Sequence, residues 1–157
     1  QDVYLDHSTW ADLPYKFEAG TPAIGEAVGM GAALNYLEQI GLENIAAWEA
    51  ELTLHLFNRL QGIDGLRILG PTPQQQPERG ALATFLVDGV HANDIAAMLD
   101  LAGICIRSGH HCCQPLHRHY QVTGSARASL SFITTTAEID RFADELQGVI
   151  TFFRDNS

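Results

Sequence analysis

The spacing of apolar residues changes once along this chain, from a helical period to an extended one. Before the change, apolar side chains recur three and four residues apart over Ala23–Ile40 and Leu42–Leu60, which predicts two long amphipathic helices. Gly41 ends the first helix and leaves room only for a turn or a sharp kink. The segment Gly62–Gly65 then breaks the helical pattern. These helices must therefore be followed by a layer of a different kind.

Beyond residue 65 the pattern is that of short strands mixed with helices. A helix is expected from His91 through Leu101, and another after Thr135, which has Glu138 at the spacing of a capping box. Two helices followed by this ββαββα order predict an α+β layer. The predicted strands are Leu66–Leu69, Ala81–Val87, Ile104–Arg107 and Ala126–Ile133.

The composition is that of a folded protein and argues against two classes of partner. Hydrophobic residues make up 46% and charged residues 18%, which does not indicate disorder. Asp and Glu outnumber Lys and Arg by 19 to 9, and the basic residues form no cluster, so we expect no nucleic acid partner. No apolar run reaches the roughly 18 residues of a membrane span, so no membrane partner is expected either.

The three cysteines predict reduced thiols. Cys112 and Cys113 are adjacent, where a disulfide would be strained, so we expect free thiols and a cytoplasmic location. Cys105 lies in the apolar run Ile104–Ile106, which predicts a buried and unreactive core residue.

The most reactive of these thiols is expected at Cys112, in the segment Arg-Ser-Gly-His-His-Cys-Cys over residues 107–113. A neighbouring imidazolium, from His110 or His111, would lower the thiol pKa from about 8.5 toward neutrality. Gly109 and the following Gln114–Pro115 turn predict a loop, on which the thiol can reach a substrate.

Two arginines flank this loop and provide a second chemical feature. Arg107 and Arg127 each carry a guanidinium, which binds a carboxylate through two parallel hydrogen bonds, so an amino acid is a natural substrate. A surface charge for Arg127 and an ion-pair partner for Arg107 remain open as alternatives.

Metal binding is the competing interpretation of the same loop. The run lacks the separation of about two to four residues between paired ligands that structural zinc sites use, so we predict no metal. A zinc-binding or thiol-bearing module without catalytic activity nevertheless stays an alternative. Its candidate ligands are His110, His111, Cys112, Cys113, His117 and His119.

A further candidate site lies before the first helix, in Phe17-Glu-Ala-Gly-Thr-Pro22. Backbone N–H groups at a helix start and the Thr21 hydroxyl can bind an anion. A plain helix cap with Pro22 in the first turn is the alternative.

Three stretches together, residues 17–22, residues 107–112 and Arg127-Ala-Ser-Leu130, resemble the cysteine desulfurases of the SufS type. These are class V aminotransferase-fold enzymes that use pyridoxal 5'-phosphate. The resemblance runs over essentially the whole chain and implies an α/β fold. It implies the C-terminal part of a fold type I enzyme, with long connecting helices and an α+β small domain that has a small antiparallel sheet with helices. By it, residues 1–22 are the tail of the large cofactor-binding domain, 23–62 connecting helices, and 63–157 the small domain with the reactive loop.

The resemblance also implies an activity and the residues that perform it. Sulfur is removed from L-cysteine to give L-alanine and a persulfide on Cys112, for iron–sulfur cluster assembly. Arg127 holds the substrate carboxylate, with Arg107 and His111 near the same site. Gly20 and Thr21 reach the cofactor phosphate of the partner subunit, which implies a homodimer. The sulfur acceptor is expected to be a SufE-like or SufU-like protein.

The chain departs from the family pattern in two places. The family's Schiff-base lysine has no counterpart, because Lys16 is the one lysine in the sequence and stands where the family commonly has arginine. The N-terminal portion of the enzyme is therefore an expected partner that binds most of the cofactor. Cys113 stands where the family usually has alanine, either as a second thiol that accepts the persulfide or as a tolerated small residue.

Two enzymes on the same fold are alternatives to the desulfurase. A selenocysteine lyase would use a related substrate. A cystine lyase would release persulfide without an enzyme cysteine and would have no use for Cys112.

Overall fold

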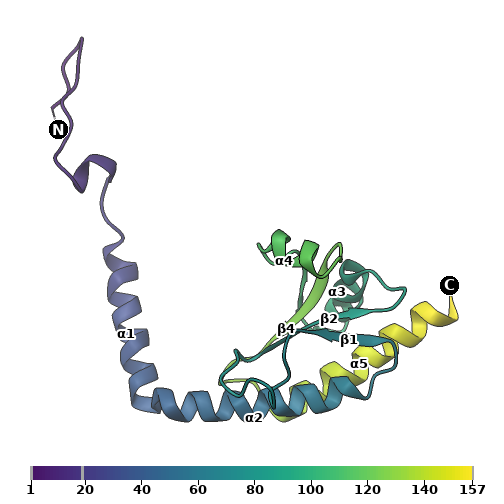
Figure 1. Cartoon of the computed structure of the whole chain (residues 1–157). Helices are drawn as coiled ribbons and strands as arrows, with labels where there is room; N and C mark the ends of the chain where they lie inside the picture. The colour runs from purple at the N-terminus through teal and green to yellow at the C-terminus, as the bar shows by residue number, and fades with distance from the viewer. Residues whose placement is uncertain (1, 19, 157) are drawn as a thin grey trace. The chain divides into compact units, whose positions relative to one another are not determined.

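The computed structural model describes residues 2–18 and 20–156 and divides into two compact units, Gln1–Leu42 and Glu43–Ser157 (Figure 1). Each unit is described by itself. The division expected from the family, at residues 22 and 62, stays a prediction.

The first unit holds a 3-10 turn, η1 (Tyr15–Phe17), and the long helix α1 (Ile24–Ile40). The predicted helix and its end are confirmed, because Gly41 has φ 91° and its N–H donates to the carbonyl of Leu37. The N-cap is Ala23, with no side-chain cap, so the alternative of a plain cap with Pro22 in the first turn is wrong. Within residues 2–18 and 20–42, no residue is buried.

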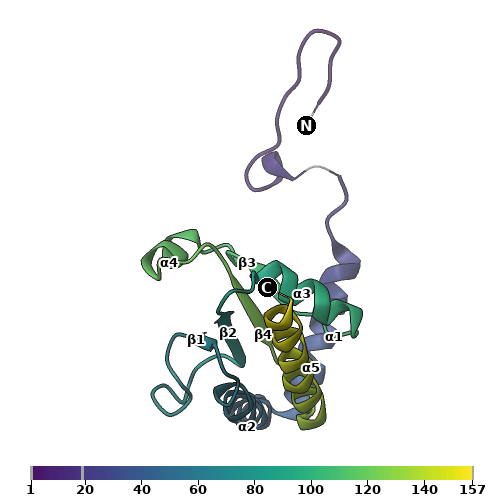
Figure 2. The same cartoon turned by 90° about the vertical axis from the view of Figure 1, so that its right-hand side faces the viewer.

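The second unit begins within α2 (Leu42–Gln61) and contains a four-stranded antiparallel sheet, as predicted. The strand order is β1-β2-β4-β3 (Figure 2). The strands are β1 (Leu66–Leu69), β2 (Leu82–Val87), β3 (Arg107–Gly109) and β4 (Ser125–Ser129), and the remaining helices are α3 (Ala92–Leu101), α4 (Gln114–His119) and α5 (Thr136–Asp155).

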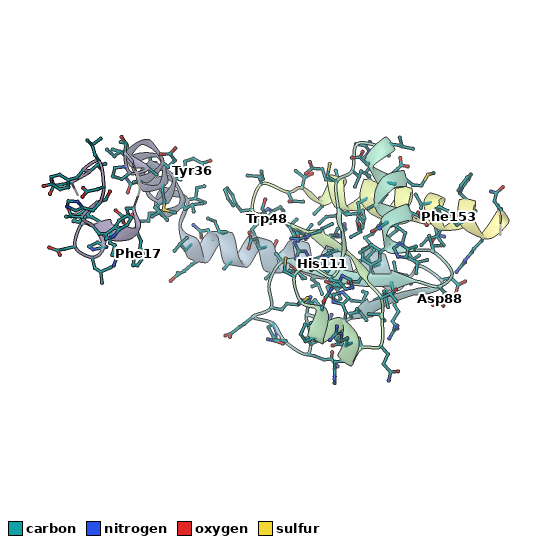
Figure 3. All side chains as sticks on the ribbon, turned by 90° about the horizontal axis from the view of Figure 1, so that it is seen from above. Phe17, Tyr36, Trp48, Asp88, His111 and Phe153 are labelled. Carbon is teal, nitrogen blue, oxygen red and sulfur yellow. The ribbon has the colours of Figure 1, made fainter. Side chains whose placement is uncertain are left out.

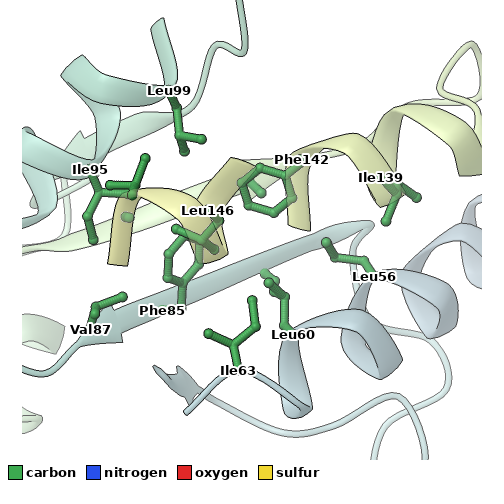
Figure 4. Packing of buried hydrophobic residues seen from close by; sticks show 14 of the residues in the cluster. Leu56, Leu60, Ile63, Phe85, Val87, Ile95, Leu99, Ile139, Phe142 and Leu146 are labelled. Atoms are coloured by element: carbon green, nitrogen blue, oxygen red, sulfur yellow. The ribbon is translucent and has the colours of Figure 1, made fainter. Parts of the chain in front are cut away.

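One face of the sheet carries the hydrophobic core (Figure 4). Along β2 the buried residues alternate, since Ala83, Phe85 and Val87 point to this face. Helices α2, α3 and α5 cover it with fully buried side chains, each of which contributes about 1.5–3 kcal/mol by leaving water. These include Leu52, Leu56 and Leu60 of α2, Ile95 and Leu99 of α3, and Ile139, Leu146 and Ile150 of α5.

The capping box predicted for the last helix is confirmed. The Thr135 hydroxyl accepts from the N–H of Glu138, and the Glu138 carboxylate accepts from the N–H of Thr135. The start of α5 is therefore fixed by its own sequence. In the part of the chain that the structure describes, no helix is both long and apolar enough to cross a membrane.

The third strand begins three residues later than predicted and ends two residues later. Gly103 has φ 72° and the N–H of Ile104 donates to the carbonyl of Leu99, so this segment stays tied to α3. Ladder pairing begins only at Arg107. Ile104 and Ile106 pack against the core, and Cys105 between them points outward. The prediction of a buried Cys105 is therefore wrong.

Two further predictions need correction. The fourth strand ends at Ser129, not Ile133, because Ser131 and Thr134 form a turn closed by two hydrogen bonds. The Gln114–Pro115 turn is the first turn of the short helix α4, where proline without an N–H is well tolerated. In Figures 1 and 2, α4 lies away from α5, at the end of β3 and β4.

Candidate active site around Cys112

The second face of the sheet brings the two predicted arginines together. Arg107 and Arg127 are direct cross-strand partners of β3 and β4, so their side chains leave the sheet on the same face. Thr84 of β2 pairs with Arg127 from the other side. Because Ala126 and Ala128 point into the core, Ser125 and Arg127 necessarily point to this second face.

The reactive loop leaves β3 through a tight turn with left-handed backbone. Gly109 has φ 107°, and both His111 (52°) and Cys112 (60°) adopt a conformation that is costly for side chains other than glycine. The turn is closed by the N–H of Cys113, which donates to the carbonyl of His110 at 2.9 Å. It presents the Cys112 side chain to solvent.

The cation next to the Cys112 sulfur is a guanidinium. Arg107 Nη2 lies 3.6 Å from Cys112 Sγ, a distance at which it can stabilise negative charge on the sulfur. The sequence predicted an imidazolium in this role, from His110 or His111. In the structure the positive charge comes from Arg107, five residues earlier in the sequence, because strand β3 places this residue next to the turn.

His111 is directed away from the thiol, into the protein. Its Nε2 lies 3.1 Å from both the carbonyl oxygen and the hydroxyl of Ser125. Burial lowers the pKa of His111, and the nearby charge of Arg127 lowers it further. The ring is therefore neutral at physiological pH, and its Nε2 donates, since a carbonyl only accepts.

A buried polar chain continues from Ser125 to a second thiol. Ser125 Oγ lies 2.9 Å from Nε2 of His117, and His117 Nδ1 lies 3.2 Å from the carbonyl of Cys113 and 3.7 Å from its sulfur. Since that carbonyl accepts, His117 Nδ1 carries the hydrogen and Nε2 accepts from the Ser125 hydroxyl. His117 is 4% exposed and Ser125 is fully buried, so these hydrogen-bonded side chains are held in place.

Sequence reasoning listed His117 only as a metal ligand and did not identify Ser125. The four-residue separation of Cys113 and His117, together with proline just after Cys113, was the available signal for a helical turn that joins them. Among the residues that the structure describes, no group of three or more His, Cys, Asp or Glu side chains is arranged to hold a metal ion.

A pocket of about 230 Å³ opens beside these hydrogen-bonded side chains. His111, which Figure 3 labels, is one of the residues that line it. It lies on the second face of the sheet, between β2, β4 and α4, and combines apolar walls with a cation and a thiol. Its lining includes Leu82, Thr84, His111, Cys113, Tyr120 and Arg127. Cys113 is half-buried here, whereas Cys112 is exposed.

The residues predicted to hold the cofactor belong to the first unit. Gly20 has φ 82° with open space where a Cβ would be, and Thr21 is exposed, so both backbone and hydroxyl can approach a phosphate. Lys16 lies over the ring of Phe17. The chain thus offers donors for a phosphate, but no second lysine that could form the Schiff base.

Comparison with known proteins identifies the family of this chain. The Aminotransferase class-V family model matches residues 1–142. A probable cysteine desulfurase of Synechocystis is 54% identical over 155 residues, which are 99% of this chain and 37% of that protein. Another, from Xylella fastidiosa, is 45% identical over 142 residues, 90% of this chain and 33% of that protein. The chain thus spans about a third of the length of these relatives.

Solved structures show the same fold. The apo cysteine desulfurase of Thermococcus onnurineus superposes with a TM-score of 0.80 at 33% identity, over 97% of this chain and 37% of that one. The S-sulfonic acid form of the cysteine desulfurase CsdA from Escherichia coli gives 0.79 at 29% identity, over the same shares of the two chains. This chain belongs to the class-V aminotransferase family and has the fold of the C-terminal part of cysteine desulfurases.

Proposed function

We propose that this chain is the sulfur-accepting portion of a pyridoxal 5'-phosphate-dependent cysteine desulfurase. The reaction converts L-cysteine to L-alanine and leaves the sulfur as a persulfide on Cys112. The observation that carries the proposal is the exposed Cys112 thiol, held on a strained turn with the Arg107 guanidinium 3.6 Å from its sulfur.

Cys112 acts as the nucleophile toward the substrate sulfur. A thiolate is required for this attack, and Arg107 stabilises negative charge on the sulfur before the attack and on the persulfide after it. The exposed turn also serves the next step, because the persulfide must be offered to an outside acceptor.

Arg127 binds the substrate carboxylate. It is the direct neighbour of Arg107 in the sheet and lines the pocket of the second face, so an amino acid held there lies beside the reactive turn. Its Nε donates to Ser129 at 3.1 Å, which orients the guanidinium plane for binding two carboxylate oxygens.

The cofactor supplies the electron sink that makes the carbon–sulfur bond of the substrate breakable. Gly20 and Thr21 contact its phosphate in the partner subunit of a homodimer, and the N-terminal portion of the enzyme contributes the Schiff-base lysine. This chain covers 37% and 33% of the length of the two relatives named above, which supports the division of the enzyme into this chain and an N-terminal portion. The persulfide passes to a SufE-like or SufU-like acceptor for iron–sulfur cluster assembly in the cytoplasm.

The decisive experiment measures alanine released from L-cysteine by the holoenzyme that contains this chain. Cys112→Ala should lower the rate by more than about 100-fold, because a covalent step needs its nucleophile. Cys105→Ser, which removes another exposed thiol, is the matched control and should keep the rate. Full release of alanine from L-cysteine by Cys112→Ala would contradict the role of Cys112 as the nucleophile.

A second variant tests whether Arg127 binds the carboxylate of the substrate. Arg127→Lys keeps the charge and loses the bidentate geometry, so the KM for L-cysteine should rise by about tenfold, the equivalent of one good hydrogen bond. An unchanged KM would remove Arg127 from the substrate site.

A further inference from the structure

We propose that Cys113 is a second sulfur carrier, which takes the outer sulfur of the Cys112 persulfide and holds it in the pocket of the second face. This inference rests on the proposed desulfurase function, since the enzyme must first load Cys112. It extends that function, because the chain would then hold two transferable sulfur atoms, one on each thiol.

The two adjacent thiols lie in different surroundings. Cys112 is exposed and faces the Arg107 guanidinium. Cys113 is half-buried, and its sulfur lines the pocket together with His111 and Arg127. One thiol is therefore placed to meet an outside acceptor, and the other to keep a sulfur atom away from water and external thiols.

The polar groups around Cys113 suit both forms of its sulfur. As a thiol it donates to the carbonyl of His110 at 3.0 Å. As an anion it can accept from the Nδ1–H of His117 at 3.7 Å, a hydrogen that the Ser125 hydroxyl holds on that nitrogen by occupying Nε2. A buried chain of this kind does not reorganise when the charge changes.

The transfer is an exchange between a thiol and a persulfide. The Cys113 sulfur attacks the outer sulfur of Cys112, a new sulfur–sulfur bond forms, and the bond to Cys112 breaks. Cys112 leaves as a thiolate and takes up the proton that Cys113 gives away, so no oxidant or reductant is needed.

The experiment counts cyanide-labile sulfur in the holoenzyme after loading with L-cysteine and removal of excess substrate. All samples carry Cys105→Ser, so that only the two neighbouring thiols remain in this chain. We expect about two labile sulfur atoms per chain with both thiols present and about one in Cys113→Ala and in Cys113→Ser. Fragmentation mass spectrometry of the peptide that carries both thiols assigns each sulfur to its cysteine.

Three outcomes would overturn the proposal. The first is one sulfur per chain, on Cys112 alone, when both thiols are present. The second is an unchanged count in the Cys113 variants. The third is sulfur on Cys113 after loading of Cys112→Ala with L-cysteine, which would show that it does not arrive through Cys112.

A second loading reaction separates this inference from the desulfurase activity. If no alanine is formed, the proposed function fails, and the same protein is then loaded with one equivalent of inorganic polysulfide. Labile sulfur that appears on Cys113 in this protein but not in its Cys112→Ala variant supports the carrier role, and sulfur confined to Cys112, or equal labelling of Cys113 in both proteins, contradicts it.

Discussion

The two units of this chain differ in how their apolar residues are used. In the second unit, apolar side chains of α2, β2, α3 and α5 meet in one closed core. In the first unit, most of the large apolar side chains are exposed, among them Phe17 at 81% and Val28 at 70%. Both units contain well-formed helices, so helix formation does not distinguish them.

The difference shows that the second unit contains its own folding information and the first does not. A helix with apolar residues around its surface gains little free energy unless another element covers it. In α1 the residues Ile24, Val28, Met30, Leu34 and Tyr36 are all more than half exposed. The N-terminal portion proposed above is the element that would cover them.

The strongest test of this comparison truncates one leucine in each unit of the chain. Leu56→Ala removes a fully buried side chain and should lower the free energy of unfolding by about 2–5 kcal/mol. Leu34→Ala removes one that is 54% exposed and should change it by less than about 0.5 kcal/mol. Chemical denaturation measures both, and equal losses would break the comparison.

Measuring Leu56→Ala and Leu34→Ala in the holoenzyme as well makes the comparison of the two units sharper. There Leu34→Ala should also destabilise, since the proposed N-terminal portion buries the helix. A Leu34 variant that stays neutral in the holoenzyme would show that α1 is exposed in the complete protein too.

Helix caps provide a smaller contrast. Helix α5 starts at the Thr135 capping box, whereas α1 starts at Ala23 without a side-chain cap. Thr135→Ala should therefore cost about 1 kcal/mol of unfolding free energy, measured by thermal denaturation. Thr136→Ala, an exposed change one residue later, is the control. A loss of equal size for both would contradict a role for the cap.

The smallest expected effect concerns pH. The pKa of His111 is lowered from 6.5 in the folded second unit, so the unfolded chain binds more protons there and stability falls as pH drops below 6.5. His111→Asn should flatten the fall in unfolding free energy between neutral pH and the lowered pKa. His119→Asn, which removes an exposed imidazole from the same unit, is the matched control. Identical pH profiles for His111→Asn and the parent protein would contradict the lowered pKa.

Most of the fold followed from local sequence signals. The helical period, Gly41 and the Thr135 capping box gave both long helices and the last one with ends within about two residues of the observed ones. The third strand was misplaced because apolar residues at Ile104 and Ile106 serve the core without forming a ladder. Apolar residues at every second position show which face of an extended segment is buried, but they do not show where it pairs with another strand.

The residues of the site could be predicted from the sequence, but the contacts between them could not. The sequence singled out Cys112, Arg107 and Arg127, and the strand register brings the two arginines together. The contact between Arg107 and the thiol depends on left-handed backbone at two residues without glycine, which no local pattern indicates. The buried Ser125 needed the tertiary position of α4 for its partner.

The most direct measurement locates the sulfur after a single turnover of the holoenzyme with L-cysteine. Rapid quenching, alkylation and peptide mass spectrometry follow each cysteine of the chain in time. The account predicts that the first labelled sulfur appears on Cys112, in step with alanine. Alanine formed with no sulfur on Cys112 at any time would contradict it.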